Sequence, residues 1–234
     1  LLGKGIYNSP KDKHQQGTHE SLFCARPGLE VKSASTWAMS KDYYNPKEVM
    51  EAARLMLSVA DKYQGNNNFE YDLVDILRQA ISEKGRLVLK VVSAAYQAED
   101  KALFDMASNS FLNLILLQDE LLGTRKEFRV GNWTGMARKI GNTLEEKDLY
   151  EWNARVQITT WGNRDVADKG KLRDYAHKEW NGILKDFYYK RWKIYFEGLS
   201  ASLEGKQLPV IDWYAIEEPW TKISDTYSAT PEDN

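Results

Sequence analysis

Aromatic and charged side chains that could bind a sugar are concentrated between residues 151 and 192, which hold four of the eight tryptophans. Trp161, followed by a glycine suited to a C-cap, lies at the predicted end of one helix. Leu172 and Tyr175 lie three residues apart in the predicted first turns of the next helix, and therefore on one face. The charged loop between the helices, Gly162–Gly170, is short enough to bring the two ends together. Because sugar rings stack on indole and phenol while polar groups hold their hydroxyls, this junction is a candidate sugar-binding wall.

The same aromatic residues have a second interpretation. Trp161 and Tyr175 would also serve as core contacts between two antiparallel helices, and large helical cores use such residues freely. Residue types and spacing alone favour core packing over sugar binding. The sugar-binding hypothesis therefore needs support from outside the local pattern.

Three aspartates beside the aromatic residues raise the question of glycosidase chemistry. A retaining glycosidase needs two carboxyl groups about 5–5.5 Å apart, and an inverting one needs about 6.5–9.5 Å. Asp165, Asp168 and Asp174 are close in sequence, but they lie among lysines and arginines, and Asp168 suits a helix N-cap. Solvated and capping charges explain these residues, so we predict no catalytic residue in this chain.

Composition argues against several other kinds of site. The 234 residues carry a formal net charge of −2 with both signs interspersed, so we expect no nucleic-acid partner. No apolar run approaches the roughly 18 residues that span a bilayer, so we expect no membrane partner. His14, His19 and Cys24 match no standard zinc spacing, and we predict neither a metal nor a cofactor.

Apolar periodicity predicts an all-α fold, a multi-helix bundle with long antiparallel helices and an irregular N-terminal segment. Residues 1–44 are expected to form an irregular lead-in that packs on the domain, residues 45–224 the helical domain, and residues 225–234 a loose tail. The pair Asn45-Pro46 and a capping box at Thr143 mark two helix starts. The predicted helices cover residues 45–63, 68–96, 99–122, 130–140, 143–161, 171–204 and 211–224.

Four segments of the chain resemble the α-N-acetylglucosaminidases, glycoside hydrolase family 89. They are FEYDLVDILRQA at 69–80, LYEWNARVQITTWG at 149–162, RDYAHK at 173–178 and YYKRW at 188–192. In that family the matching patterns read FxYDLLDLTRQA, FYExNxRxQxTxWG, LDYANK and YYxxRW, in the same order and at similar spacing. Weaker similarity reaches back to Tyr7-Asn8, so the resemblance covers nearly the whole chain.

The resemblance implies that this chain is the all-helical C-terminal domain of a larger enzyme with a central (β/α)8 barrel. That enzyme removes terminal α-linked N-acetylglucosamine with retention, using two glutamates on the barrel. Such an enzyme takes part in glycosaminoglycan or mucin glycan degradation and is exported or lysosomal. The absence of an initiating methionine also leads us to expect part of a longer protein.

Family matching assigns roles to six residues of this chain. Trp161, Leu172 and Tyr175 are the expected pocket-lining residues, and the pocket is completed against the barrel. Arg155, Asp174 and Arg191 are expected supports, and Arg191, which interrupts an apolar helix stripe, needs a buried partner. The alternative is a freestanding helical module that binds a glycan or a protein.

Overall fold

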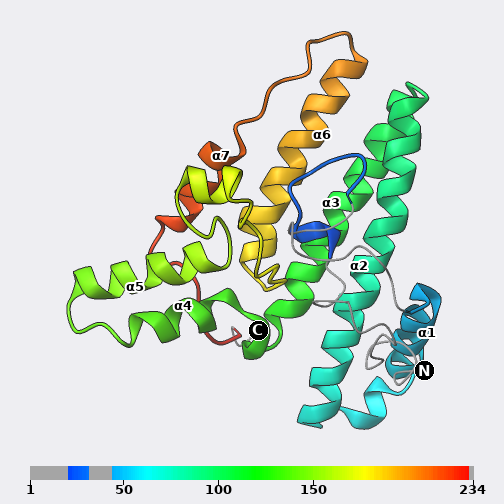
Figure 1. Cartoon of the computed structure of the whole chain (residues 1–234). Helices are drawn as coiled ribbons and strands as arrows, with labels where there is room; N and C mark the ends of the chain where they lie inside the picture. The colour runs from blue at the N-terminus through cyan, green and yellow to red at the C-terminus, as the bar shows by residue number, and fades with distance from the viewer. Residues whose placement is uncertain (1–20, 32–43, 232–234) are drawn as a thin grey trace.

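The computed structural model describes residues 21–31 and 44–231. Within these ranges the chain is helical, and the only β-type pairing is an isolated bridge between Arg129 and Asn181. The α-helices are α1 (Pro46–Leu57), α2 (Asn67–Gln97), α3 (Lys101–Gly123), α4 (Val130–Arg138), α5 (Leu144–Gln157), α6 (Tyr189–Leu203) and α7 (Trp213–Thr221) (Figure 1). The all-α prediction is confirmed. None of these helices is long and apolar enough to cross a membrane.

Two long antiparallel helices, α2 and α3, form the central pair of the bundle, and α6 packs along α3 (Figure 1). Asn66 caps α2 by accepting a hydrogen bond from the Phe69 N–H at 3.1 Å, and Asp100 caps α3 in the same way through Leu103. The chain reverses between the two helices within residues 98–100. Local capping signals therefore define both ends of the turn that makes this pair antiparallel.

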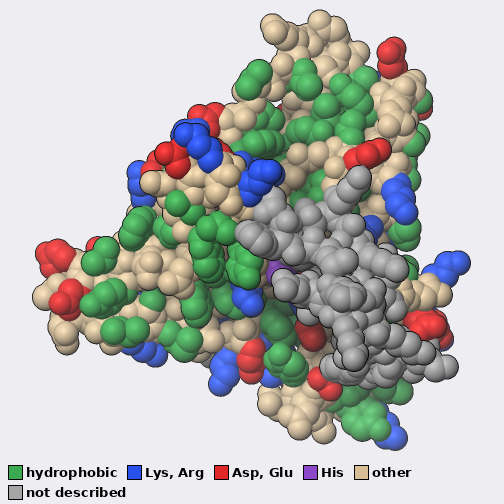
Figure 2. Space-filling model, viewed as in Figure 1, with side chains coloured by type: hydrophobic (Ala, Val, Ile, Leu, Met, Phe, Trp, Pro, Cys, Tyr) green, Lys and Arg blue, Asp and Glu red, His purple; other side chains and the backbone are tan. Residues whose placement is uncertain are grey.

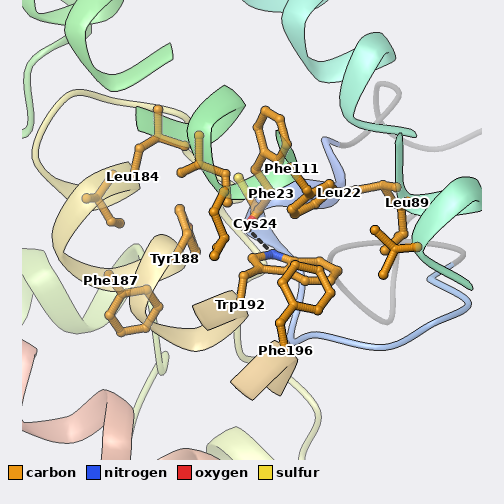
Figure 3. Close-up of a cluster of buried hydrophobic side chains, with 14 of the residues drawn as sticks. Leu22, Phe23, Cys24, Leu89, Phe111, Leu184, Phe187, Tyr188, Trp192 and Phe196 are labelled. Carbon is orange, nitrogen blue, oxygen red and sulfur yellow. Dashed lines mark hydrogen bonds between the residues drawn. The ribbon is translucent and has the colours of Figure 1, made fainter. Parts of the chain in front are cut away.

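The main core lies where the N-terminal segment meets α3 and α6 (Figure 3). Phe23 belongs to a short 3₁₀ helix, Leu22–Cys24, and its ring lies 5.2 Å from that of Phe111 in an edge-to-face contact. Phe111 in turn packs on Trp192 at 4.6 Å, and the Trp192 indole N–H donates to the Phe23 carbonyl at 3.1 Å. Residues 22–24 are thus an integral part of the core, since large buried aromatic side chains dominate core energetics.

A separate arm is formed by α4 and α5 (Figure 1). Thr143 and Glu146 make the predicted capping box at the start of α5, with both reciprocal hydrogen bonds present. Trp133 of α4 joins the two helices, because its indole N–H donates to the Ala154 carbonyl at 2.9 Å. The capping signal in the sequence therefore locates the turn of this helical hairpin correctly.

The described part of the C-terminal tail packs against the helices. Tyr227 donates from its hydroxyl to the Asp186 carboxylate at 2.7 Å and accepts from the Trp220 indole N–H at 2.9 Å. The backbone of Ser228 lies so close to Gly131 that a Cβ on that glycine would be 2.2 Å from the Ser228 carbonyl oxygen. Tyr227 and Ser228 therefore lie at the junction of α4, α7 and the turn Leu184–Tyr188 that leads into α6.

The largest departure from the sequence prediction lies between residues 158 and 183. One helix was expected up to Trp161 and the next from residue 171, but α5 ends at Gln157 and the helical turn that leads into α6 begins only at Ile183. The buried side chains of residues 171–179 are the carboxylates Asp174 and Glu179, so this stretch has no apolar stripe to stabilise a helix. Leu172 and Tyr175 therefore do not lie in helical turns.

The loop after α5 also differs from expectation. A π-helical turn spans Asp165–Lys169, and a second spans Leu184–Tyr188 and leads directly into α6. Asp168 lies inside the first turn, so its predicted role as an N-cap is wrong. Such turns are rare and occur frequently at functional sites, which draws attention to this part of the chain.

Gly85, within α2, offers a direct test of the core packing. A Gly85→Ala substitution would place a Cβ 2.6 Å from the ring of Phe23, which is fully buried against Phe111. We expect the free energy of unfolding, measured by urea denaturation, to fall by about 1–3 kcal/mol because the overpacked ring has little room to move.

The matched control is Gly135→Ala in α4, where the nearest neighbour of the new Cβ is 4.0 Å away. Alanine is the better helix former, so this variant should gain up to about 1 kcal/mol. Equal effects of the two substitutions would contradict the proposed packing of Phe23 on α2.

Candidate functional site

The structure brings Trp161 and Tyr175 together as an exposed aromatic wall. Their ring centroids are 5.3 Å apart with the planes tilted by 56°. Trp161 is 38% exposed and Tyr175 is 48% exposed, so the interpretation of these rings as buried core contacts is wrong. Leu172 is half-buried and accepts a backbone hydrogen bond from the Tyr175 N–H at 3.3 Å. Two rings open to solvent beside an aliphatic side chain can stack on a flat apolar ligand face.

The backbone that carries the wall is held in unusual conformations. Positive φ angles occur at Trp161 (62°), Lys171 (56°), Asp174 (56°) and His177 (32°). Conformations of this kind cost about 1–3 kcal/mol each in non-glycine residues and cluster at functional sites. Contacts with the surrounding structure must therefore hold these backbone conformations in place.

Gly162 has a different role from the predicted C-cap glycine. The left-handed conformation belongs to Trp161, whose N–H donates to the Val156 carbonyl at 2.8 Å. An added Cβ on Gly162 would lie 3.0 Å from the side chain of Val166, so the glycine permits close packing of the following turn. The left-handed backbone of Trp161 itself therefore sets the direction of its indole at the end of α5.

One backbone hydrogen bond joins the two sides of the wall. The Asp174 N–H donates to the Thr159 carbonyl at 2.8 Å, which ties the residue before Tyr175 to a residue two positions before Trp161. The Leu172 N–H donates to the Val166 carbonyl at 3.3 Å and connects the same segment to the π-helical turn. These bonds explain how rings fourteen residues apart in sequence remain in contact.

Beneath the wall, Asp174 forms a buried ion pair with Arg191 of α6. Nη1 of Arg191 donates to Oδ2 of Asp174 at 3.0 Å and to Oε1 of Glu217 at 2.8 Å. Nη2 donates to the Cys24 carbonyl at 2.6 Å. Arg191, Asp174 and Glu217 are each about 1% exposed at the side chain. The prediction that Arg191 needs a buried partner is confirmed.

Arg26 of the N-terminal segment extends this group of charges. Its Nε and Nη2 donate to the two carboxylate oxygens of Glu217 at 2.8 and 2.7 Å, and its Nη1 donates to Asp168 at 2.6 Å. Bidentate pairing of this kind fixes geometry as well as adding energy. We call the five residues Asp168, Arg26, Glu217, Arg191 and Asp174 the arginine network.

Arg155, the third expected support, lies in a separate cluster. It is fully buried and donates from Nε to Glu151 at 2.8 Å. Its guanidinium lies over the rings of Trp220 and Tyr227, with centroid distances of 4.7 and 5.1 Å. Arg155 therefore binds α5 to α7 and the C-terminal residues, and it reaches the wall only through the α5 backbone.

Glu179 anchors the far end of residues 161–179, which we call the wall segment, to the long helices. Its carboxylate accepts hydrogen bonds from Arg78 at 2.9 Å, Ser82 at 2.8 Å and Gln118 at 2.7 Å. Arg78 and Ser82 belong to α2 and Gln118 belongs to α3. The segment between Asp174 and Glu179 is thus held by a buried carboxylate at each end.

Nothing in the described residues resembles a metal site, since no group of three or more His, Cys, Asp or Glu side chains is suitably placed there. His14 and His19 lie outside the described residues. Cys24 is buried in the core, and burial raises the pKa of its thiol well above the usual value.

Arg26 and Glu217 were not among the residues predicted from the sequence. A usable signal for Glu217 exists, because α7 places it on the face that also buries Tyr214 and Trp220, where an unpaired carboxylate would be costly. Arg26 carries no local signal, because it lies in irregular chain. Its partner Glu217 is 191 positions away in the sequence. Contacts over such separations depend on the completed fold.

Burial raises the pKa of Asp174 to about 6; Arg191 opposes this increase and Glu217 adds to it. Because an unfolded aspartate titrates near ~3.9, only the folded chain keeps this proton between about pH 4 and pH 6. The carboxyl therefore contributes stability below pH 4 that is lost as the pH rises to about 6.

We expect this loss to disappear in an Asp174→Asn variant, which cannot titrate. Between pH 4 and 6, the free energy of unfolding of the unsubstituted chain should fall relative to that of the variant by at most about 3 kcal/mol. Urea titrations of both proteins across this range measure the difference. Parallel pH profiles would contradict the elevated pKa.

Comparison with solved structures places the fold. A family 89 glycoside hydrolase from Clostridium perfringens in complex with PUGNAc superimposes with a TM-score of 0.94 at 38% identity, covering 100% of this chain and 27% of that chain. The same values hold for a variant of the Clostridium perfringens protein in complex with its substrate GlcNAc-alpha-1,4-galactose. The fold is that of a helical part of family 89 glycoside hydrolases.

Sequence comparison identifies the family more narrowly. Residues 1–234 match the family described as the Alpha-N-acetylglucosaminidase (NAGLU) C-terminal domain, and the chain belongs to that family. It is 32% identical to human Alpha-N-acetylglucosaminidase over 204 residues, or 87% of this chain and 26% of that protein. The chain therefore spans about a quarter of the length of the relatives it matches.

Proposed function

We propose that this chain completes the substrate pocket of a retaining α-N-acetylglucosaminidase. In this proposal the two catalytic glutamates lie on a (β/α)8 barrel in another part of the full-length polypeptide. The helical domain supplies Trp161, Leu172 and Tyr175 as one wall around a terminal, non-reducing, α-linked N-acetylglucosamine. The observation that carries the proposal is the exposed ring pair, 5.3 Å apart, on a strained segment of a chain from this family.

The charges near the wall fit a binding role better than a catalytic one. Asp168 and Asp174 are paired with Arg26 and Arg191, and Asp165 with Lys169 at 2.9 Å. A catalytic acid or nucleophile must reach the glycosidic bond, whereas these carboxylates are already bound to cations. In this proposal, hydrolysis requires the catalytic part of the full-length polypeptide. We expect that polypeptide to be an exported or lysosomal enzyme, as the family implies.

An apolar strip on α5 is the surface that we expect the rest of the polypeptide to cover. Leu149 and Trp152 share one helix face with Val156, which is buried and accepts a hydrogen bond from the Trp161 N–H through its carbonyl. Leu149 is 56% exposed and Trp152 is 43% exposed. Hydrophobic side chains gather over the α4–α5 arm in Figure 2. The strip leads along α5 towards the wall, as a barrel that shares the pocket would require.

Substitutions in the full-length enzyme test the wall. Trp161→Ala and Tyr175→Phe should each reduce kcat/KM on an aryl α-N-acetylglucosaminide by about 10-fold or more, because contacts with the sugar are lost. Tyr63→Phe, at a remote exposed tyrosine, is the matched control and should be neutral. Unchanged kinetics in both wall variants, with unchanged thermal stability, would contradict the proposal.

The isolated 234-residue chain should be inactive on the same substrate, because it lacks the proposed glutamates. Activity in the purified chain would contradict their placement on another part of the polypeptide.

Reading the coding sequence upstream of Leu1 separates the proposal from a freestanding binding module. A barrel-coding region there supports the proposal.

The exposed strip makes a further prediction about the isolated chain. It should self-associate with increasing concentration, measured by light scattering, because contiguous apolar surface drives association. Leu149→Ser should weaken this association, whereas Leu87→Ser on α2, at a site 47% exposed, should not. A chain that stays monomeric at high concentration would argue against an uncovered docking strip.

A further inference from the structure

Glu217 is the shared partner of both arginines in the arginine network. Its Oε1 accepts from Nη1 of Arg191 and from Nε of Arg26, both at 2.8 Å, and its Oε2 accepts from Nη2 of Arg26 at 2.7 Å. The carboxylate is 1% exposed and is carried by α7, whose first turn is capped by Asp212. Glu217 therefore sets the relative position of two guanidinium groups from distant parts of the chain.

Each arginine also binds a residue of the segment that carries the wall. Arg191 holds Asp174, the residue directly before Tyr175, through both carboxylate oxygens at 3.1 and 3.0 Å. Asp174 has a φ of 56° and binds the Thr159 carbonyl through its N–H. Arg26 holds Asp168 in the π-helical turn at 2.6 Å. The wall segment is thus attached at two points to one carboxylate.

The charges leave little freedom for this arrangement to change. With Glu217 ionised, each arginine lies between two carboxylates, and the two positive groups are separated by a negative one. Without that charge, the buried guanidinium of Arg191 and the partly buried one of Arg26 would face a neutral side chain, and each would keep only one carboxylate partner, its aspartate. Asp174 and Asp168 would then be free to shift independently, and the ring of Tyr175 would shift with the first of them.

We propose that Glu217 is a positioning residue for the Trp161–Tyr175 wall, acting through Arg191 and Arg26 without touching the substrate. The proposal rests on the proposed function of the wall. A displaced wall weakens substrate and transition state equally, so its signature is a raised KM with an unchanged kcat. A general loss of folded enzyme has the opposite signature, a lower apparent kcat at unchanged KM.

The test is a double-mutant cycle in the full-length enzyme. Glu217→Gln keeps the side-chain shape but removes its charge, and we expect KM for an aryl α-N-acetylglucosaminide to rise by about tenfold with kcat within about twofold. In a Tyr175→Ala background, where the ring is gone, Glu217→Gln should raise KM less than about twofold. The control is Glu218→Gln, the next residue on α7, whose carboxylate binds Tyr214 and Lys222 instead and which should leave KM unchanged.

Each outcome decides one point. Equal KM increases in both backgrounds, or a loss confined to kcat with a lower melting temperature, would overturn the positioning role. If Glu217→Gln does not yield folded enzyme, Asp168→Asn decides, since its side chain is 34% exposed and it removes one attachment of the wall segment. An unchanged KM in that variant also overturns the proposal.

The same variants separate failure of this proposal from failure of the proposed function. If Tyr175→Ala itself leaves the kinetics unchanged, the proposed function fails. If only Glu217→Gln leaves them unchanged, the wall stands and its positioning by Glu217 fails.

Discussion

The buried guanidinium of Arg191 is the interaction on which both the bundle and the aromatic wall depend. It joins the wall segment through Asp174, α7 through Glu217 and the N-terminal segment through the Cys24 carbonyl. Moving such a charge out of water costs several kcal/mol and is tolerated only with close, hydrogen-bonded partners. The three segments must therefore be in place together, because a partly assembled set of partners is worse than none.

This constraint explains how an exposed surface can be well ordered. The two rings of the wall have solvent on one side, and core packing alone would leave them free to move. Their backbone instead takes unfavourable φ angles that persist only because buried carboxylates hold it from below. A surface organised before the ligand arrives loses less conformational entropy on binding, which is the usual advantage of preorganisation.

Much of the fold could be predicted from local signals, whereas the site could be predicted only in part. Capping residues and apolar stripes located α2, α3 and the α4–α5 hairpin within a few residues, because these signals lie within the helices themselves. The partner requirement of Arg191 followed from a charge in an apolar stripe. The non-helical course of residues 171–182 could not be predicted in this way, since it depends on ion pairs of Asp174 with α6 and of Glu179 with α2 that no local pattern records. The role of Arg26 was unpredictable for the same reason.

The burial of Phe23 and the ion pair of Arg26 have a consequence for where the folding unit begins. A helical domain drawn from the first α-helix, at Pro46, would omit a ring that fills the centre of the core and a cation that neutralises Glu217. The hole left by a phenylalanine alone typically costs about 3–5 kcal/mol, a large share of a domain's net stability. Residues 22–26 thus act as a built-in plug, and their insertion belongs to the same cooperative transition that shapes the wall.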